Sequence, residues 1–204
     1  MFQYDADCQS SRMLTTEIKN IKLSVNFRHI ESLDTVRNKC SKSCVEYKEK
    51  SNYICFKLGG KKRFSYTIFR PNEKFPSPNH INITGIKSSS EINFSVRRLR
   101  KFLGVRLKKS SIRIDNITGS LNTKKEIFLK EFVQKISQYK SDFTLTVKYN
   151  NESFPGAFVR VRKNFEKVGT IIFFHSGKVI FVGCSDFDKI KCLELLSLAL
   201  TQTK

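Results

Sequence analysis

An internal duplication is the sequence feature that most constrains the fold. The segment IKNIKLSVN at residues 18–26 matches IDNITGSLN at residues 114–122, an offset of 96 residues. A second pair, INITGIKSSSEI at residues 81–92 and VIFVGCSDFDKI at residues 179–190, has an offset of 98 residues. Self-similarity of this kind indicates that one structural unit is used twice. Two anchors at nearly one offset therefore predict two similar halves within the 204 residues.

The spacing of apolar residues predicts the same order of elements in both halves. In the first half we expect a strand at 18–26, a helix at 31–48, strands at 53–58, 64–69 and 81–85, and a helix at 88–103. In the second half we expect a strand at 112–121, a helix at 125–139, strands at about 157–163, 168–175 and 178–183, and a last helix beginning at SDFD, residues 185–188. The segment 142–149 also alternates, which leaves an extra strand and a structured loop both open.

The helix ends and faces carry their own signals. Ser88 with Glu91 forms a capping-box pattern, and Gly104 is a typical stop after a helix. Ser185 is expected to cap the last helix. The residues expected to face inward are Leu33, Val36, Cys40, Cys44 and Tyr47 in the first helix, Phe128, Phe132, Ile136 and Tyr139 in the third, and Leu193, Leu196 and Leu200 in the last.

One face of each sheet is left without a cover, because two helices per half can protect only one side. The period of two in a strand sends Ile117, Leu121, Val179 and Phe181 to the helix side. The opposite side of the second half then carries Asn116, Thr118, Ser120, Ile172, Phe174, Ile180 and Val182. This side is apolar and hydroxylated and has almost no charge. An exposed surface of that composition indicates a binding site.

The charge balance indicates what such a surface would bind. Lys and Arg number 38 against 18 Asp and Glu, a net charge of +20 and a pI of about 9.9. A folded chain this basic usually binds a polyanion, with nucleic acid ahead of an anionic membrane. The helix at 88–103 fits an amphipathic membrane helix only weakly. A ligand with anionic edges and a flat, partly apolar floor fits best, and the DNA minor groove is such a ligand.

Enzymatic and metal chemistry find little support in the sequence. The six cysteines form no CxxC pair and the three histidines are scattered, so neither a metal site nor a cofactor is expected. SGKV at residues 176–179 is a P-loop fragment that lacks the upstream glycine. His175 and Cys184 have no third group to orient them. The N-terminus has no apolar signal region, and no apolar run reaches the length of a membrane span, so an intracellular protein is expected.

Five segments, in order, resemble the TATA-binding protein family. IKNIKLSV and INITGIKSSSEI are similar to the first repeat of that family, and IDNITGS, FPGAFVRV and IIFFHSGKVIFVG are similar to the second. The resemblance implies an α+β fold, a saddle of two pseudo-symmetric repeats, each a curved antiparallel sheet with two helices on its convex face. Residues 1–16 would form an N-terminal tail, 17–108 the first repeat and 109–204 the second. The divergence points to a source such as a large DNA virus or an unusual eukaryote.

The resemblance also assigns roles to residues on the concave face. Asn20 and Asn116 match a central asparagine pair whose amides satisfy minor-groove acceptors, although asparagines in local turns are an alternative. Phe154 and Phe174 match aromatic wedges that enter between base pairs, and Tyr53 and Phe69 are taken as their first-half counterparts. Arg160 matches an arginine that contacts a phosphate at the edge of the groove. The remaining expected DNA contacts are Lys22, Ser24, Thr67, Asn82, Thr84, Thr118, Ser120, Ile172, Ser176, Ile180 and Val182.

The first half departs from the family pattern in ways that change the expected contacts. Lys22 stands where the family has a valine, Asn82 replaces another apolar residue, and Thr67 stands where a leucine is usual. We therefore expect the first half to hold DNA by polar contacts and charge more than by apolar packing. A strict preference for the standard TATA sequence is not expected. Thr84 keeps the usual threonine.

The resemblance predicts a general transcription initiation factor. It would bind A·T-rich promoter DNA through the minor groove, bend it and nucleate a preinitiation complex in the nucleus or in a cytoplasmic viral factory. Glu152 would contact a B-type initiation factor or its viral equivalent, with the RNA polymerase machinery as the wider partner. The alternative is an architectural saddle that binds DNA or RNA without sequence preference. For the basic run at 96–109, a solvated helix face, a phosphate contact and a site for an acidic factor remain open.

Overall fold

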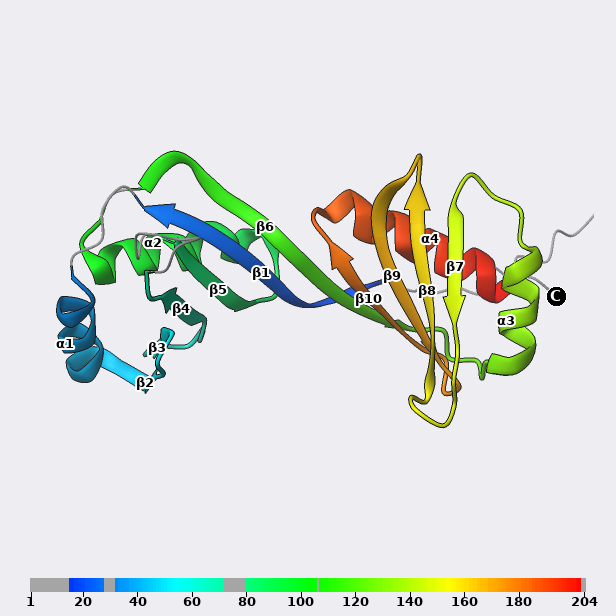
Figure 1. Cartoon of the computed structure of the whole chain (residues 1–204), viewed down its shortest axis with the longest axis horizontal. Coiled ribbons are helices and arrows are strands. Elements are labelled where there is room, and N and C mark those ends of the chain that lie inside the picture. The colour runs from blue at the N-terminus through cyan, green and yellow to red at the C-terminus, as the bar shows by residue number, and fades with distance from the viewer. Residues whose placement is uncertain (1–14, 28–31, 72–79, 106, 203–204) are drawn as a thin grey trace, which may run out of the picture.

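The fold joins two lobes through two long central strands (Figure 1). The computed structural model describes residues 15–27, 32–71, 80–105 and 107–202, so the expected N-terminal tail lies almost wholly outside the described residues. The described elements are β1 Glu17–Phe27, α1 Leu33–Ser43, β2 Cys44–Glu49, β3 Tyr53–Leu58, β4 Ser65–Phe69, β5 His80–Ile86, α2 Ser89–Leu103, β6 Leu107–Asn122, α3 Leu129–Gln138, β7 Thr144–Lys148, β8 Gly156–Lys163, β9 Glu166–Phe174, β10 Lys178–Cys184 and α4 Phe187–Gln202.

All described strands form one ten-stranded antiparallel sheet with the order β2-β3-β4-β5-β1-β6-β10-β9-β8-β7. The order is symmetric about the β1–β6 pair, so each half contributes five strands in the same sequence. Together with two helices from each half, this confirms the predicted α+β architecture of two repeats. The expected division at residues 108 and 109 falls within the first residues of β6 and stays a prediction.

The helices cover one face of the sheet and bury its alternate residues. In α2, Phe102 packs on Phe56 of β3 with ring centroids 5.2 Å apart. In α3, Phe132 packs edge-on against Phe173 of β9 at 4.5 Å. Phe173 is fully buried, whereas its neighbour Phe174 is only partly buried. The predicted alternation is therefore confirmed: the covered face forms the core, and the opposite face, called the open face below, carries none of the described helices.

The first helix is shorter than the sequence predicts. α1 ends at Ser43, and Cys44 has extended backbone angles, φ −93° and ψ 142°. Cys44 and Tyr47, expected on the helix face, lie instead in β2, which pairs with β3. The segment CVEYKE alternates well enough to form a strand, and ladder hydrogen bonds to β3 compensate for the shorter helix. Val36 and Cys40 are buried as expected.

The third helix begins later than predicted, at Leu129. Residues 123–127 are held beside the β9–β10 turn, where the Thr123 amide donates to Gly177 O at 2.9 Å and the Ile127 amide donates to His175 O at 2.9 Å. Phe128 therefore sits just before the helix and is 62% exposed, contrary to its expected place in the core. Tyr139 follows the last helical residue rather than belonging to the helix.

Two of the predicted helix caps differ in detail. Ser88 makes no capping hydrogen bond, and the Glu91 carboxylate accepts from the Lys87 amide at 2.8 Å, one residue before the expected donor. At α4, Asp186 rather than Ser185 caps the helix, since its Oδ1 accepts from the Lys189 amide at 2.8 Å. A carboxylate at that position also interacts favourably with the helix dipole.

Other expectations at the element ends are met. Gly104 ends α2 in the left-handed region with φ +75°. For the segment 142–149, where a strand and a loop were both open, the structure has an edge strand, β7, at Thr144–Lys148, paired with β8. None of the described helices is both long enough and apolar enough to cross a membrane.

Candidate nucleic-acid interface

Cross-strand pairing brings most of the predicted contact residues together on the open face. In the second half, Ile172 pairs with Ile180, which pairs with Ser120. In the first half, Thr67 pairs with Asn82, which pairs with Ser24. Other predicted contact residues also pair across strands on this face: Asn20 with Thr118, Lys22 with Asn116, Thr84 with Ser65, and both Val182 and Arg160 with Thr170. Ser24 and Ser120 are buried, and most of the others are half-buried.

The central asparagines are held in the same way in both halves. The Gly85 amide donates to Asn20 Oδ1 at 2.7 Å, and the Gly183 amide donates to Asn116 Oδ1 at 2.7 Å. Because a backbone N–H can only donate, each contact fixes the oxygen of the side-chain amide and leaves its nitrogen as the free donor. Asn116 Nδ2 donates one of its two hydrogens to Thr118 Oγ1 at 3.2 Å, which leaves the second hydrogen for a ligand. Both asparagines thus bind a neighbouring strand, which differs from the alternative in which they stabilise local turns.

The two glycines make this arrangement possible. Gly85 has φ +87° and Gly183 has φ +80°, in the region that glycine adopts without strain. Each lies near the end of a strand, where its N–H leaves the sheet ladder and is available to the asparagine. The pair Gly85 and Gly183 was visible in the sequence as an anchor of the duplication, but its hydrogen bonds to the asparagines were not.

An aromatic cluster lies at the second-half end of the open face. The Phe154 ring is 5.8 Å from that of Phe174 and 4.8 Å from that of Phe158. Gly156 allows this arrangement, because a Cβ there would lie 2.8 Å from Phe154 Cε1. Phe158 was missed by sequence analysis, although it pairs with Ile172 and follows the period of two from Arg160.

The first-half aromatic pair is not equivalent to the second. Tyr53 pairs with Phe69, whereas Gly156 pairs with Phe174. By register, Tyr53 therefore takes the place of Gly156, and position 51, a serine, takes the place of Phe154. The Tyr53 and Phe69 rings still lie edge to face with centroids 6.4 Å apart.

A polar cluster occupies the first-half side of the open face. Ser24 Oγ donates to Asp115 Oδ2 and lies 3.2 Å from Asn82 Oδ1. Arg113 Nε donates to Asp115 Oδ1 at 2.9 Å, and Lys22 Nζ lies 3.9 Å from Oδ2. Lys22, Ser24 and Asn82 were predicted for this face. Asp115 was not, because strict alternation from Asn116 sends it to the covered side.

The matches to known proteins agree with this geometry. Residues 111–193 match the family model of transcription factor TFIID, or TATA-binding protein. Within its second half, the chain therefore resembles the TATA-binding protein family. A solved structure of Methanococcus jannaschii TBP superposes with a TM-score of 0.64 at 19% sequence identity, over 92% of this chain and 99% of that one. No curated protein of similar sequence was found. The predicted viral source stays a prediction, since neither match supports it.

The matched family consists of DNA-binding, transcription-factor-like proteins that are not enzymes. His175 and Cys184 lie at opposite ends of β10, so they do not form a site. Burial raises the pKa of the Cys184 thiol to about 11, which keeps it protonated and unreactive. Among the described residues, no three His, Cys, Asp or Glu side chains come together to hold a metal ion.

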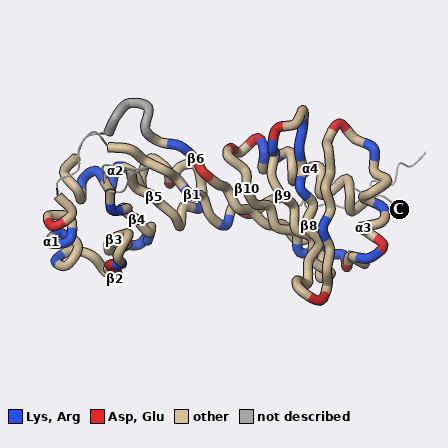
Figure 2. The backbone as a smooth tube through the Cα atoms, in the orientation of Figure 1, with Lys and Arg blue, Asp and Glu red and all other residues tan. Residues whose placement is uncertain are grey.

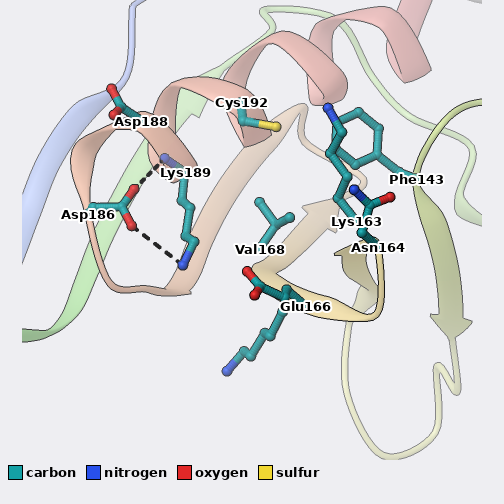
Figure 3. A pocket seen from close by; sticks show the side chains of 10 residues that line it. Phe143, Lys163, Asn164, Glu166, Val168, Asp186, Asp188, Lys189 and Cys192 are labelled. Atoms are coloured by element: carbon teal, nitrogen blue, oxygen red, sulfur yellow. Dashed lines mark hydrogen bonds and ion pairs between the residues drawn. The ribbon is translucent and has the colours of Figure 1, made fainter.

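A cavity lies away from the open face, between the β8–β9 turn and α4 (Figure 3). It has a volume of about 620 Å³. Two of its lysines are engaged locally, since Lys189 pairs with Asp186 at 3.4 Å and Lys163 Nζ lies 5.6 Å from the centre of the Phe143 ring. Burial raises the pKa of the Cys192 thiol in its wall, so this cysteine is a poor nucleophile.

Positive charge is spread over both halves of the molecule (Figure 2). The basic run at 96–109 lies mainly on α2, which buries Val96, Leu99 and Leu103 against the covered face. The exposed side chains of α2 therefore point away from the open face. Within the run, Arg98 is engaged, because its guanidinium donates to Lys62 O at 2.6 Å. Glu152, the predicted partner contact, is exposed in the turn between β7 and β8, where its amide donates to Asn150 Oδ1 at 3.0 Å.

Proposed function

We propose that the chain binds promoter DNA through the minor groove, bends it by inserting aromatic side chains and nucleates a transcription preinitiation complex. The observation that carries this proposal is the pair of asparagines held by glycine amides, Asn20–Gly85 and Asn116–Gly183. The minor groove of an A·T pair offers only acceptors, adenine N3 and thymine O2. Two fixed amide donors at the centre of an open sheet match two such acceptors across neighbouring base pairs.

The aromatic cluster supplies the bending step. Phe154 and Phe174 lie at the edge of the open face and are only half-buried without a ligand. An apolar ring that enters between base pairs unstacks them and kinks the duplex, and the TATA-binding protein family is itself the established example of this behaviour. In the first half, Phe69 with Tyr53 would act at the opposite edge.

A bending assay tests the proposal. Short duplexes carry a donor and an acceptor fluorophore at their ends, with either an A·T-rich or a G·C-rich centre. Binding is expected to raise the transfer efficiency, because a kink brings the two ends together. Absence of end-to-end shortening on every duplex would overturn DNA bending.

An architectural role is the second candidate function, and the polar cluster around Lys22 and Asn82 favours it. Polar and charged side chains there would hold the groove through its backbone more than through base edges. Selection of bound duplexes from a random pool separates the two candidates. An enriched sequence supports promoter recognition, whereas an unchanged pool supports an architectural protein.

The proposed partners follow from the proposed promoter role. A B-type initiation factor or its viral equivalent would contact the β7–β8 turn at Glu152, and the polymerase machinery would follow. The protein would act where its template lies, in the nucleus or, for a viral chain, in a cytoplasmic factory. In the family pattern this turn offers acidic residues and a leucine to the factor. Asn150 and Ser153 replace one of those acids and the leucine, so an ordinary host factor would fit poorly. Mixing a cognate factor with the DNA complexes of the wild type and of Glu152→Lys tests this contact by mobility shift.

A further inference from the structure

We propose that Asp115 binds the 2-amino group of a guanine, so that the first-half side of the open face selects a G·C pair. The inference rests on the proposed minor-groove function and adds a specificity-determining residue to it. It predicts a mixed site, in which the central asparagines face A·T pairs and Asp115 faces a G·C pair nearby.

A bulge in the sheet places Asp115 on the open face. Lys22 pairs with Asn116 and the next residue, Leu23, pairs with Ile114, so Asp115 is an extra residue in β6. A bulge re-aims a side chain that alternation would send to the other face. The hydrogen bond from Ser24 Oγ confirms the result, because Ser24 pairs across the strands with Asn82 on the open face.

The same bulge occurs at the pseudo-symmetric position with the opposite charge. Ile18 pairs with Gly119 and Asn20 pairs with Thr118, so Lys19 is the extra residue in β1. Lys19 and Asp115 are 96 residues apart, the offset of the duplication. The two bulges thus differ in charge: Lys19 is paired with Glu17, whereas Asp115 is a carboxylate beside two cations.

Neighbouring cations make a carboxylate tolerable against DNA. Arg113 donates to Oδ1 at 2.9 Å, and Lys22 Nζ lies 3.9 Å from Oδ2. Two positive charges offset the single negative one, so the cluster as a whole attracts the polyanion. The Asp115 side chain keeps 17% of its surface exposed. A carboxylate has about four acceptor positions, and the hydrogen bonds from Ser24 and Arg113 occupy two of them.

The chemistry of the groove then selects the base pair. An ionised carboxylate only accepts hydrogen bonds, and guanine N2 is the only base donor in the minor groove. Adenine N3 and thymine O2 are acceptors and would face the carboxylate without a proton between them. Asp115 therefore favours G·C and disfavours A·T at its position, the reverse of the effect of the asparagines.

A base-analogue experiment on the wild-type protein tests the proposal. A single G·C pair is moved stepwise through an A·T-rich duplex, and affinity is measured at each position in both orientations. We expect one position at which G·C binds more tightly than A·T. Replacing that guanine by inosine removes only the 2-amino group and should weaken binding about tenfold, within the range of one specific base contact. Replacing it by 7-deazaguanine, which alters only the major groove, should change nothing.

Two variants link the effect to the residue. Asp115→Asn should lose the preference for guanine over inosine, because an amide can also donate to the acceptors of an A·T or I·C pair. Lys19→Gln, at the equivalent bulge, should keep it. Equal binding of guanine and inosine by the wild type at every position, or an unchanged preference in Asp115→Asn, overturns the proposal while leaving DNA bending intact. Absence of binding and bending on all duplexes overturns the proposed function as well.

Discussion

The hydrogen bond between a backbone amide and an asparagine determines which end of that side chain meets a ligand. In both halves a glycine N–H binds the amide oxygen, so the nitrogen is the group presented to the open face. Without the glycine, the asparagine could turn either end outward and would match acceptors and donors equally well. Under the proposed minor-groove function, a preference for A·T would therefore depend on two glycines that do not themselves face DNA.

This dependence predicts the effect of Asn116→Asp. The new carboxylate keeps an oxygen for the Gly183 amide, so the fold is expected to keep its thermal stability. The DNA-facing donor is replaced by a negative acceptor, which should weaken binding to A·T-rich duplexes by about 1–3 kcal/mol, the scale of one specific base contact. Fluorescence anisotropy measures the affinity, with Asn93→Asp as the control, because Asn93 is exposed on α2 and α2 covers the opposite face. Unchanged affinity in Asn116→Asp would mean that this residue does not face DNA.

Glu49 ties the end of β2 to α1 and to the end of β4 through its carboxylate. Arg37 donates to it from Nε at 3.0 Å and Nη2 at 2.8 Å, Tyr47 Oη donates at 2.6 Å, and Arg70 also pairs with it. The hydrogen bonds from Arg37 first, and then from Tyr47, lower the pKa of Glu49 to about 2. The ionised group therefore stabilises the folded state.

The pH dependence of that stabilisation follows from the direction of the shift. A lowered pKa in the folded state gives stability that is present above the unfolded pKa, about 4.3, and is lost as the pH falls toward 2. Glu49→Gln should therefore lower the melting temperature at pH 7, and the difference from wild type should shrink as the pH falls from 5 to about 2. A difference that stays constant over this range would show that Glu49 does not stabilise as an anion.

At the scale of elements, the two ends of the open face differ in their aromatic content. The second half has three rings in contact, Phe154, Phe158 and Phe174, whereas the first half has Phe69 with Tyr53. Tyr53 carries a hydroxyl that would lose its hydration on insertion. The two halves are therefore expected to contribute unequally to bending.

This asymmetry is tested with Phe174→Ala and Tyr53→Ala. Both residues are half-buried surface positions, so both variants are expected to fold. Loss of a ring that stacks on a base costs about 1–3 kcal/mol, and Phe174→Ala should lose that amount in DNA affinity and reduce the bend. Tyr53→Ala should lose less. Equal losses in the fluorescence bending assay would contradict the asymmetry.

Sequence analysis predicted those elements whose pattern is set by burial and missed those set by pairing. The alternation of β9 and β10 and the inward leucines of α4 follow directly from apolar spacing. The end of α1 could not be predicted in this way, because the spacing of CVEYKE also fits a helix. The segment becomes a strand because it pairs with β3. Asp115 was missed for a related reason: a bulge depends on the register of two strands and leaves no mark in the spacing of one.

At the scale of the whole molecule, some cationic side chains lie on the open face of the sheet and others lie on the helices that cover the opposite face. Arg160 lies on the open face, where it pairs with Thr170 across the sheet. Arg97 is exposed on α2, which covers the opposite face. A net charge of +20 would attract DNA in either case. If DNA binds the open face as proposed, however, only cations on that face come close enough to phosphate to displace its counterions.

The salt dependence of binding measures this difference. The logarithm of affinity should fall linearly and steeply with the logarithm of salt concentration, with a slope of about −0.9 for each phosphate contacted. Arg160→Gln should make the slope shallower by about 1, the loss of one phosphate contact. Arg97→Gln removes the same charge from the covered side and should weaken binding slightly while leaving the slope unchanged. Equal changes of slope in both variants would mean that DNA contacts α2 as well as the open face, and a flat slope in the wild type would exclude phosphate contacts altogether.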